Sequence, residues 1–181
     1  MDNVITIVSG LPRSGTSMMM QILESGGMEV ITDNIRKANE DNPLGYYEYE
    51  RVKKIKDDTG WLKETRGKAF KMISQLLYDL PSNENYKVIF MKRKMNEILA
   101  SQSKMLERMG SCKDGTSDEK MGEFFDKHLS KIIDWIEGRK YIDVLYIDYS
   151  DFLINPDELI KTLNRFLNYK LNEEKALYPI K

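Results

Sequence analysis

The stretch "VSGLPRSGTS", residues Val8 to Ser17, joins a short apolar run to a longer one and decides the fold. The β-branched run Val4 to Val8 suits a strand that is buried on both faces. The segment "TSMMMQILES", which begins at Thr16, is apolar almost all round and stops before two glycines, which is typical of a helix end. The sequence therefore predicts a strand, a loop and a helix in this order.

The composition of this loop indicates an anion-binding site. Gly10 and Gly15 let the backbone approach a ligand closely, and Arg13 adds a planar fork of donors. The first amides of a helix have no acceptor within it, and the helix dipole favours a negative group there. A Walker loop has a lysine after its second glycine, where this chain has Thr16. We expect an anion site that uses Arg13 in place of this lysine; the alternative is a glycine turn that only caps the helix.

The rest of the chain alternates between strand and helix patterns. Further strands are expected over residues 68–73, 86–93 and 143–148, helices over 46–58, 96–109, 121–136 and 155–167, and loops over 32–45 and 110–120. Such alternation favours a parallel sheet. We predict a single domain over residues 1–181 with a P-loop NTPase-like, three-layer α/β fold, in which helices flank a central parallel sheet of four or five strands.

Composition excludes several function classes. The 28 basic and 29 acidic residues nearly cancel, so nucleic acid is not an expected partner. Cys112 has no disulfide partner in the chain and no zinc-ligand spacing with His128, so we expect no metal. The N-terminus is unlike a signal peptide and no stretch could span a bilayer, which favours a cytoplasmic protein. His128 is the only histidine, and its place in a predicted helix fits a half-buried residue better than a catalytic one.

A second candidate anion site follows the strand over residues 86–93. Arg93 stands at the carboxyl end of this strand, where open parallel sheets bind ligands, and Ser101 lies about two helical turns further on. A phosphate held between the two side chains is geometrically reasonable. The alternative is that residues 92–94, "KRK", form a solvated basic turn.

Together the two motifs resemble those of the sulfotransferase family, with a resemblance that runs in outline from Val4 to Leu167. The family's loop has the form G-x-P-[KR]-S-G-T and holds the 5′-phosphosulfate of 3′-phosphoadenylyl sulfate (PAPS). The matching residues here are Pro12, Arg13, Ser14, Gly15, Thr16 and Ser17. In the family, an arginine and a serine eight positions later hold the 3′-phosphate, and they match Arg93 and Ser101.

The chain departs from the family pattern in two places. Met95 stands where many members have a proline, and the glycine-rich basic segment of longer members is not seen after Leu167. A nucleotide-binding module without turnover is therefore one alternative to an enzyme. A small P-loop kinase is another, although it would need the Walker lysine and an acidic residue for a metal ion.

The resemblance implies transfer of a sulfuryl group from PAPS to a hydroxyl or amine, which leaves adenosine 3′,5′-bisphosphate (PAP), without a metal. Arg13 and the loop amides would stabilise charge on the leaving oxygen. Glu48 is the candidate general base, or else a solvated charge at a helix start. Lys71 is expected to reach the donor sulfate or the acceptor, or else to face solvent.

The sequence leaves the acceptor and the oligomeric state open. A small molecule, a glycan or a lipid would serve as acceptor. The aromatic residues Tyr46, Tyr47, Tyr49 and Trp61 form either an acceptor pocket or part of the core. Other residues are expected only to pack or to support the fold, namely Met18 to Met20, Met105, Met109, Tyr149, Asp151 and Phe152.

Overall fold

The computed structural model describes residues 3–33, 35, 45–108 and 117–180. Its centre is a parallel sheet of four strands in the order β2-β1-β3-β4. The strands are β1 (Val4–Gly10), β2 (Ala69–Lys71), β3 (Asn85–Lys92) and β4 (Ile142–Asp148). The predicted α/β fold around a parallel sheet is confirmed, and the described sheet has four strands.

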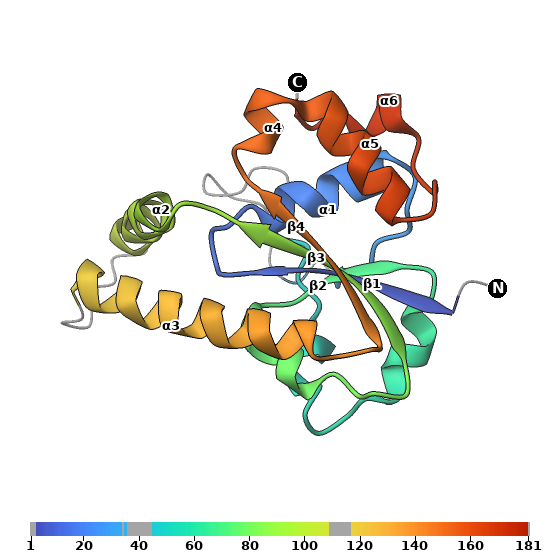
Figure 1. Ribbon diagram of the computed structural model, residues 1–181, viewed down its shortest axis with the longest axis horizontal. Helices are drawn as coiled ribbons and strands as arrows, with labels where there is room; N and C mark the ends of the chain where they lie inside the picture. The colour runs from blue at the N-terminus through green and yellow to red at the C-terminus, as the bar shows by residue number, and fades with distance from the viewer. Residues whose placement is uncertain (1–2, 34, 36–44, 109–116, 181) are drawn as a thin grey trace.

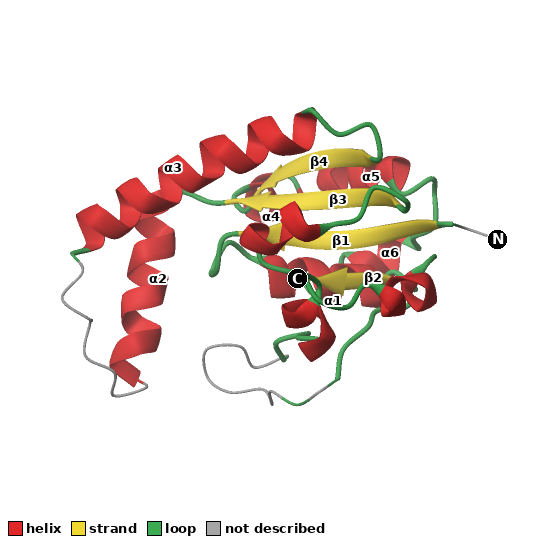
Figure 2. Ribbon diagram, turned by 90° about the horizontal axis from the view of Figure 1, so that it is seen from below, coloured by secondary structure: helices red, strands yellow, loops and turns green. Residues whose placement is uncertain are grey.

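Helices cover both faces of this sheet and make three layers (Figure 1). One face carries α1 (Thr16–Ser25), α4 (Asp151–Ile154), α5 (Pro156–Phe166) and α6 (Glu173–Ala176). The other face carries α3 (Asp118–Glu137) and three 3₁₀ helices, η1 (Glu50–Lys54), η2 (Gly60–Thr65) and η3 (Ser74–Asp79). Helix α2 (Met95–Arg108) lies beside α3 beyond the carboxyl ends of the strands (Figure 2).

Strand β1 is apolar because it is covered on both faces. Successive side chains of a strand point to opposite faces, so Ile7 packs with Phe70 and Phe90 on the α3 face, whereas Val8 packs with Ile89 on the α1 face. All three central residues Ile5, Ile7 and Val8 are fully buried. The near-continuous apolar run that marked this segment in the sequence is what a parallel strand between two helical layers requires.

The helix predicted over residues 46–58 is wrong. Tyr47 has φ 53 and Tyr49 is extended, so a helix cannot run through this part, and only η1 forms over Glu50–Lys54. The Glu48 carbonyl oxygen takes part in tertiary contacts instead, because it accepts from Thr32 Oγ1 at 3.1 Å and from the Asp33 amide at 3.1 Å. Long-range contacts therefore override the local helical preference of this segment.

Other predicted boundaries shift by a few residues. Helix α3 begins at Asp118, inside the loop predicted over 110–120, because Ser117 caps it by accepting from the Lys120 amide at 3.3 Å. The second strand is shorter than predicted and covers only Ala69–Lys71. Most of the predicted loop over 32–45, together with Cys112 and Met109, lies outside the described residues.

Candidate functional site

The site is a cavity of about 510 Å³ at the carboxyl ends of β1, β2 and β3. The loop between β1 and α1 forms one wall, and Pro12, Gly15, Thr16 and Ser17 all line the cavity. Because the first amides of α1 have no acceptor within the helix, this wall favours a negative ligand.

Ser14 closes the loop and does not line the cavity. Its amide and its hydroxyl both donate to the Leu11 carbonyl oxygen, at 3.2 and 2.7 Å, and the residue is only 1% exposed. Ser14 was predicted among the ligand-binding residues, but its hydroxyl is used within the turn. Its side chain therefore fixes the shape of the loop.

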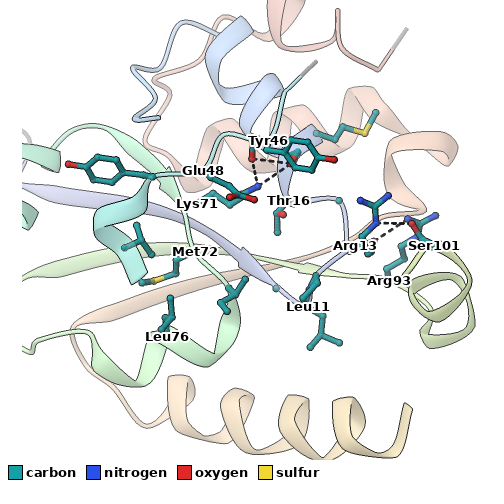
Figure 3. Close-up of a pocket in the computed structure, with 18 of the residues that line it drawn as sticks. Leu11, Arg13, Thr16, Tyr46, Glu48, Lys71, Met72, Leu76, Arg93 and Ser101 are labelled. Atoms are coloured by element: carbon teal, nitrogen blue, oxygen red, sulfur yellow. Dashed lines mark hydrogen bonds between the residues drawn. The ribbon is translucent and has the colours of Figure 1, made fainter. Parts of the chain in front are cut away.

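The two arginines of the predicted motifs come together at one end of the cavity (Figure 3). Arg13 Nε donates to Ser101 Oγ at 2.9 Å, and Arg93 Nη1 donates to the Arg13 carbonyl oxygen at 3.1 Å. Arg13 has φ 67, which is unusual for a residue with a side chain, and the bond from Arg93 holds this conformation. Residues from the loop after β1, from the end of β3 onward and from α2 thus form one hydrogen-bonded cationic cluster, Arg13–Arg93–Ser101.

Tyr149 also belongs to this end, although we expected it to be structural only. It follows β4 directly, lines the cavity, and its ring lies 4.2 Å below the guanidinium of Arg93. Glu97 accepts a hydrogen bond from the same guanidinium, with Arg93 Nε at 2.9 Å from the carboxylate. Ring and carboxylate together fix the plane of the arginine. The signal that could have found Tyr149 was its place after a strand, the same as that of Arg93.

Lys71 reaches the start of α1 from β2. Its ammonium donates to Ser17 Oγ at 3.2 Å and to the Tyr46 carbonyl oxygen. Glu48 projects into the cavity beside Lys71 (Figure 3). It lies directly before Tyr49, the N-cap of η1, so it also stands near a helix start. The predicted catalytic residues Arg13, Glu48 and Lys71 therefore line one cavity.

The sequence of residues 5–180 matches the family of sulfotransferase domains. The chain belongs to the sulfotransferase family. This match covers almost the whole chain and confirms the resemblance on which the two motifs were interpreted. A comparison with curated proteins gave no match.

Solved structures of sulfotransferases have the same fold. A sulfotransferase domain from the curacin biosynthetic pathway superposes with a TM-score of 0.60 at 17% identity, covering 98% of this chain and 77% of that one. The sulfotransferase domain of the Synechococcus PCC 7002 olefin synthase gives 0.59 at 14% identity, with 99% and 78% covered. Retinol dehydratase, solved with androsterone and the inactive cofactor PAP, gives 0.52 at 16% identity, with 97% and 63% covered.

His128 of this sulfotransferase lies outside the cavity lining. Its Nε2 lies 2.9 Å from Ser74 Oγ, between α3 and η3, and burial lowers the pKa of its imidazole. The contact ties two elements together and does not reach the cavity wall directly. The placement agrees with the sequence-based preference for a half-buried helical residue.

The aromatic and methionine residues divide between core and cavity. Trp61 is 2% exposed and packs edge-on between Tyr49 and Phe70, with ring centroids 5.4 and 5.3 Å apart, so it belongs to the core. Tyr46 and Tyr49 line the cavity, and so do Met18 and Met105, which we expected only to pack. Met19 and Met20 are fully buried, as expected.

Neither a metal site nor a membrane-spanning helix is found in the part of the chain that the structure describes. No group of three or more His, Cys, Asp or Glu side chains there is arranged to hold a metal ion. Among the same residues, no helix is both long and apolar enough to cross a bilayer.

Proposed function

We propose that this sulfotransferase transfers a sulfuryl group from PAPS to a hydroxyl or amine of a small acceptor. The observation that carries the proposal is the cationic cluster Arg13–Arg93–Ser101 beside the start of α1. It unites donors from two motifs that lie 80 or more positions apart in the sequence. The cluster offers donors for one phosphate of a nucleotide, and the start of α1 beside it offers amides for a second anionic group.

The residues at the cationic end fit such a donor. Arg13 Nε donates its hydrogen to Ser101 Oγ at 2.9 Å, so the hydroxyl hydrogen of Ser101 would donate to an anionic oxygen near this point. By resemblance, Arg93 and Ser101 would hold the 3′-phosphate, and residues 12–17 would hold the phosphosulfate. Arg93 is prepared for this role, since Tyr149 and Glu97 already fix its orientation.

Residues of the chain would assist the transfer by stabilising negative charge and by taking up a proton. PAPS supplies the sulfuryl group; the acceptor oxygen forms a bond to sulfur while the bond from sulfur to the nucleotide phosphate oxygen breaks. Lys71 and the amides at the start of α1 are placed to stabilise the charge that grows on that leaving oxygen. Glu48 is placed to take the proton that the acceptor loses.

The nucleotide is tested by thermal unfolding with PAP in the presence of EDTA. A ligand at about a hundred times its Kd stabilises the folded state by about 2.7 kcal/mol, which is visible as a rise in Tm. We expect PAP to give this rise without magnesium. Arg93→Ala should reduce this rise by about half or more, whereas the control Arg165→Ala, at an exposed position on α5, should leave it unchanged.

Two results would contradict the proposal. Stabilisation only by ATP with magnesium would favour a kinase, which Thr16 at the lysine position of the Walker loop argues against. If PAP stabilises the protein but no acceptor causes release of PAP from PAPS, the result would favour the binding module. Transfer is followed directly with PAPS that carries a radioactive sulfur.

A further inference from the structure

Two neighbouring residues of the segment before η1 contact opposite ends of α1. The Tyr46 carbonyl oxygen accepts from Ser17 Oγ at 3.4 Å, and the Tyr47 hydroxyl donates to Glu24 Oε2 at 2.5 Å. Ser17 lies in the first turn of α1 and Glu24 in the last, seven positions further on. Both side chains therefore lie on one face of the helix, about two turns apart. Tyr46 and Tyr47 together bridge this face, from the cavity wall to the far end of α1.

The backbone at Tyr47 needs contacts of this kind to keep its shape. Tyr47 has φ 53, in the left-handed region, which a residue with a side chain adopts only where its surroundings hold it there. Its ring packs against the buried cluster on the α1 face of the sheet. The next carbonyl oxygen, that of Glu48, accepts from Thr32 Oγ1 and from the Asp33 amide, both at 3.1 Å. The bond to Glu24 is a third contact, and it fixes the direction of the Tyr47 side chain.

The conformation of Tyr47 decides where the Tyr46 carbonyl oxygen points. This oxygen also accepts from the Lys71 ammonium, which lines the cavity at the start of α1 (Figure 3). The plane of the peptide that joins Tyr46 to Tyr47 depends on the φ angle of Tyr47. A return of Tyr47 to an ordinary negative φ would therefore turn the carbonyl oxygen away from Lys71.

We propose that Tyr47 and Glu24 are positioning residues for sulfuryl transfer, because their hydrogen bond keeps the Lys71 ammonium directed at the leaving oxygen of the donor. The inference rests on the proposed function, in which Lys71 stabilises the charge on that oxygen. Tyr47 and Glu24 are both described by the structure and neither lines the cavity, so they act through the Tyr46 carbonyl oxygen. A cation that is already fixed needs little reorganisation during transfer, whereas a mobile lysine side chain has to be ordered first.

Tyr47→Phe tests the inference, because it removes the hydroxyl and keeps the ring. The probe is PAPS that carries radioactive sulfur, with water as the acceptor. The water oxygen forms a bond to sulfur, the bond from sulfur to the nucleotide phosphate oxygen breaks, and sulfate, PAP and the two protons of the water are released. We expect kcat for sulfate release to fall roughly tenfold, since a small misplacement of a catalytic group is costly. The KM for PAPS and the Kd for PAP should stay within about twofold of the native values.

Further variants separate the hydrogen bond from other effects of the substitution. Glu24→Gln keeps an oxygen that accepts from the Tyr47 hydroxyl and should retain most of kcat, whereas Glu24→Ala should match Tyr47→Phe. The double variant Tyr47→Phe/Glu24→Ala should fall no further than either single variant, because both changes remove the same bond. Tyr169→Phe is the matched control, since Tyr169 also has a positive φ, of 60, and lies after α5 outside the cavity lining. It should leave kcat unchanged.

A second measurement follows Lys71 directly and does not depend on turnover. A lysine that is held by hydrogen-bond acceptors reacts slowly with an acylating reagent such as acetic anhydride, and the extent of reaction at each lysine is read by mass spectrometry. We expect acetylation of Lys71 to be about threefold faster or more in Tyr47→Phe than in the native protein, because its acceptor moves away. Acetylation of the exposed Lys131 on α3 should be the same in both proteins.

The outcomes separate this inference from the proposed function. An unchanged rate of acetylation at Lys71 in Tyr47→Phe would overturn the inference, and a lower Tm or a higher KM in the same variant would then show that the bond supports only the fold. Equal losses of kcat in Glu24→Gln and Glu24→Ala would also overturn it. Faster acetylation of Lys71 in Tyr47→Phe, with no release of sulfate from PAPS by the native protein, would support the hold on Lys71 and contradict the proposed enzyme.

Discussion

Gly15 supports the Arg13–Arg93–Ser101 cluster because it has no side chain. It has φ +100, and a Cβ at this position would lie 2.5 Å from Cδ2 of Tyr149. The bare backbone therefore lets the ring of Tyr149 lie against the loop, and this ring carries the guanidinium of Arg93 at 4.2 Å. The absence of a side chain at residue 15 thus affects Arg93, which follows strand β3.

Gly15→Ala should destabilise the protein by about 1–3 kcal/mol and weaken PAP binding. The cost combines a left-handed backbone conformation with a clash against Tyr149. Urea unfolding of the single variants and of Gly15→Ala/Tyr149→Ala measures the coupling. We expect the double variant to recover the part that comes from the clash; strictly additive losses would show that the ring does not press on residue 15.

Arg13 and Arg93 should differ in what their loss affects. Arg93→Ala removes a charged donor fork that is fixed in place, and we expect the Kd for PAP to rise about 10- to 100-fold. Arg13→Ala should instead lower kcat, by about a hundredfold, since it stands next to the start of α1 where charge develops. Calorimetry with PAP and initial rates of transfer check both. Unchanged transfer in both variants would show that the site is assigned wrongly.

At the scale of elements, one buried contact joins α3 to η3. His128 Nε2 lies 2.9 Å from Ser74 Oγ, and Ser74 is fully buried. Ser74 begins η3, which also carries Leu76 of the cavity lining. The protonation state of His128 therefore affects the stability of an element that lines the cavity.

Acidification below neutral pH should weaken the fold through His128. Burial lowers the pKa of the folded imidazole below its usual 6.5, so the unfolded chain takes up the proton first. The stabilising effect is complete above pH 6.5 and is lost as pH falls through the folded pKa. We expect the free energy of unfolding, measured in urea at pH 7.5 and 5.5, to fall less in His128→Gln than in the native protein. Equal losses would show that another group carries the effect.

Local signals explain which elements were predictable. The strand β1, the loop and α1 follow from apolar runs and glycines that are adjacent in sequence, and α5 follows from Asn155 and Pro156 at its start. Helices η1 and η2 were not predictable, because buried residues such as Val52 and Trp61 fix them through contacts with the distant sheet.

The same division holds for the candidate site. The residues of the two motifs were found because their spacing is local, and the structure brings Arg13, Arg93 and Ser101 together. The direction of the Ser14 hydroxyl and the place of Tyr149 depend on neighbours in space. No pattern within the sequence gives the direction of the Ser14 hydroxyl, and for Tyr149 the only signal was its place directly after a predicted strand.

At the scale of the whole molecule, the segment after α5 holds α1 in place. The Asn172 amide donates to the Gly26 carbonyl oxygen at 2.8 Å, just beyond the end of α1. Asn164 fixes the returning chain, since its side chain accepts from the Leu171 amide at 2.8 Å and donates to Glu173 at 2.8 Å. Because the first turn of α1 forms the cavity wall, this segment supports the site from the far end of the helix.

Asn164→Ala should lower Tm by about 4–8 °C. Asn164 is 4% exposed. Its loss leaves the buried Leu171 amide without an acceptor, which costs about 2 kcal/mol and gives this change of Tm in a chain of this size. Differential scanning calorimetry measures the change, with Asn85→Ala, at the exposed first residue of β3, as control. A Tm equal to that of the native protein would show that the returning segment does not depend on this side chain.

The order in which the ribosome makes these strands has a consequence for the cell. Strand β1 is synthesised first but lies between β2 and β3. Its second neighbour, β3, is complete only when Lys92 has been added. At about 5–20 residues per second, the ribosome needs roughly 4–16 s to travel from Gly10 to Lys92. Until Lys92 is added, the apolar strand β1 lacks its neighbour β3, and an unpaired strand edge of this kind favours aggregation of the nascent chain.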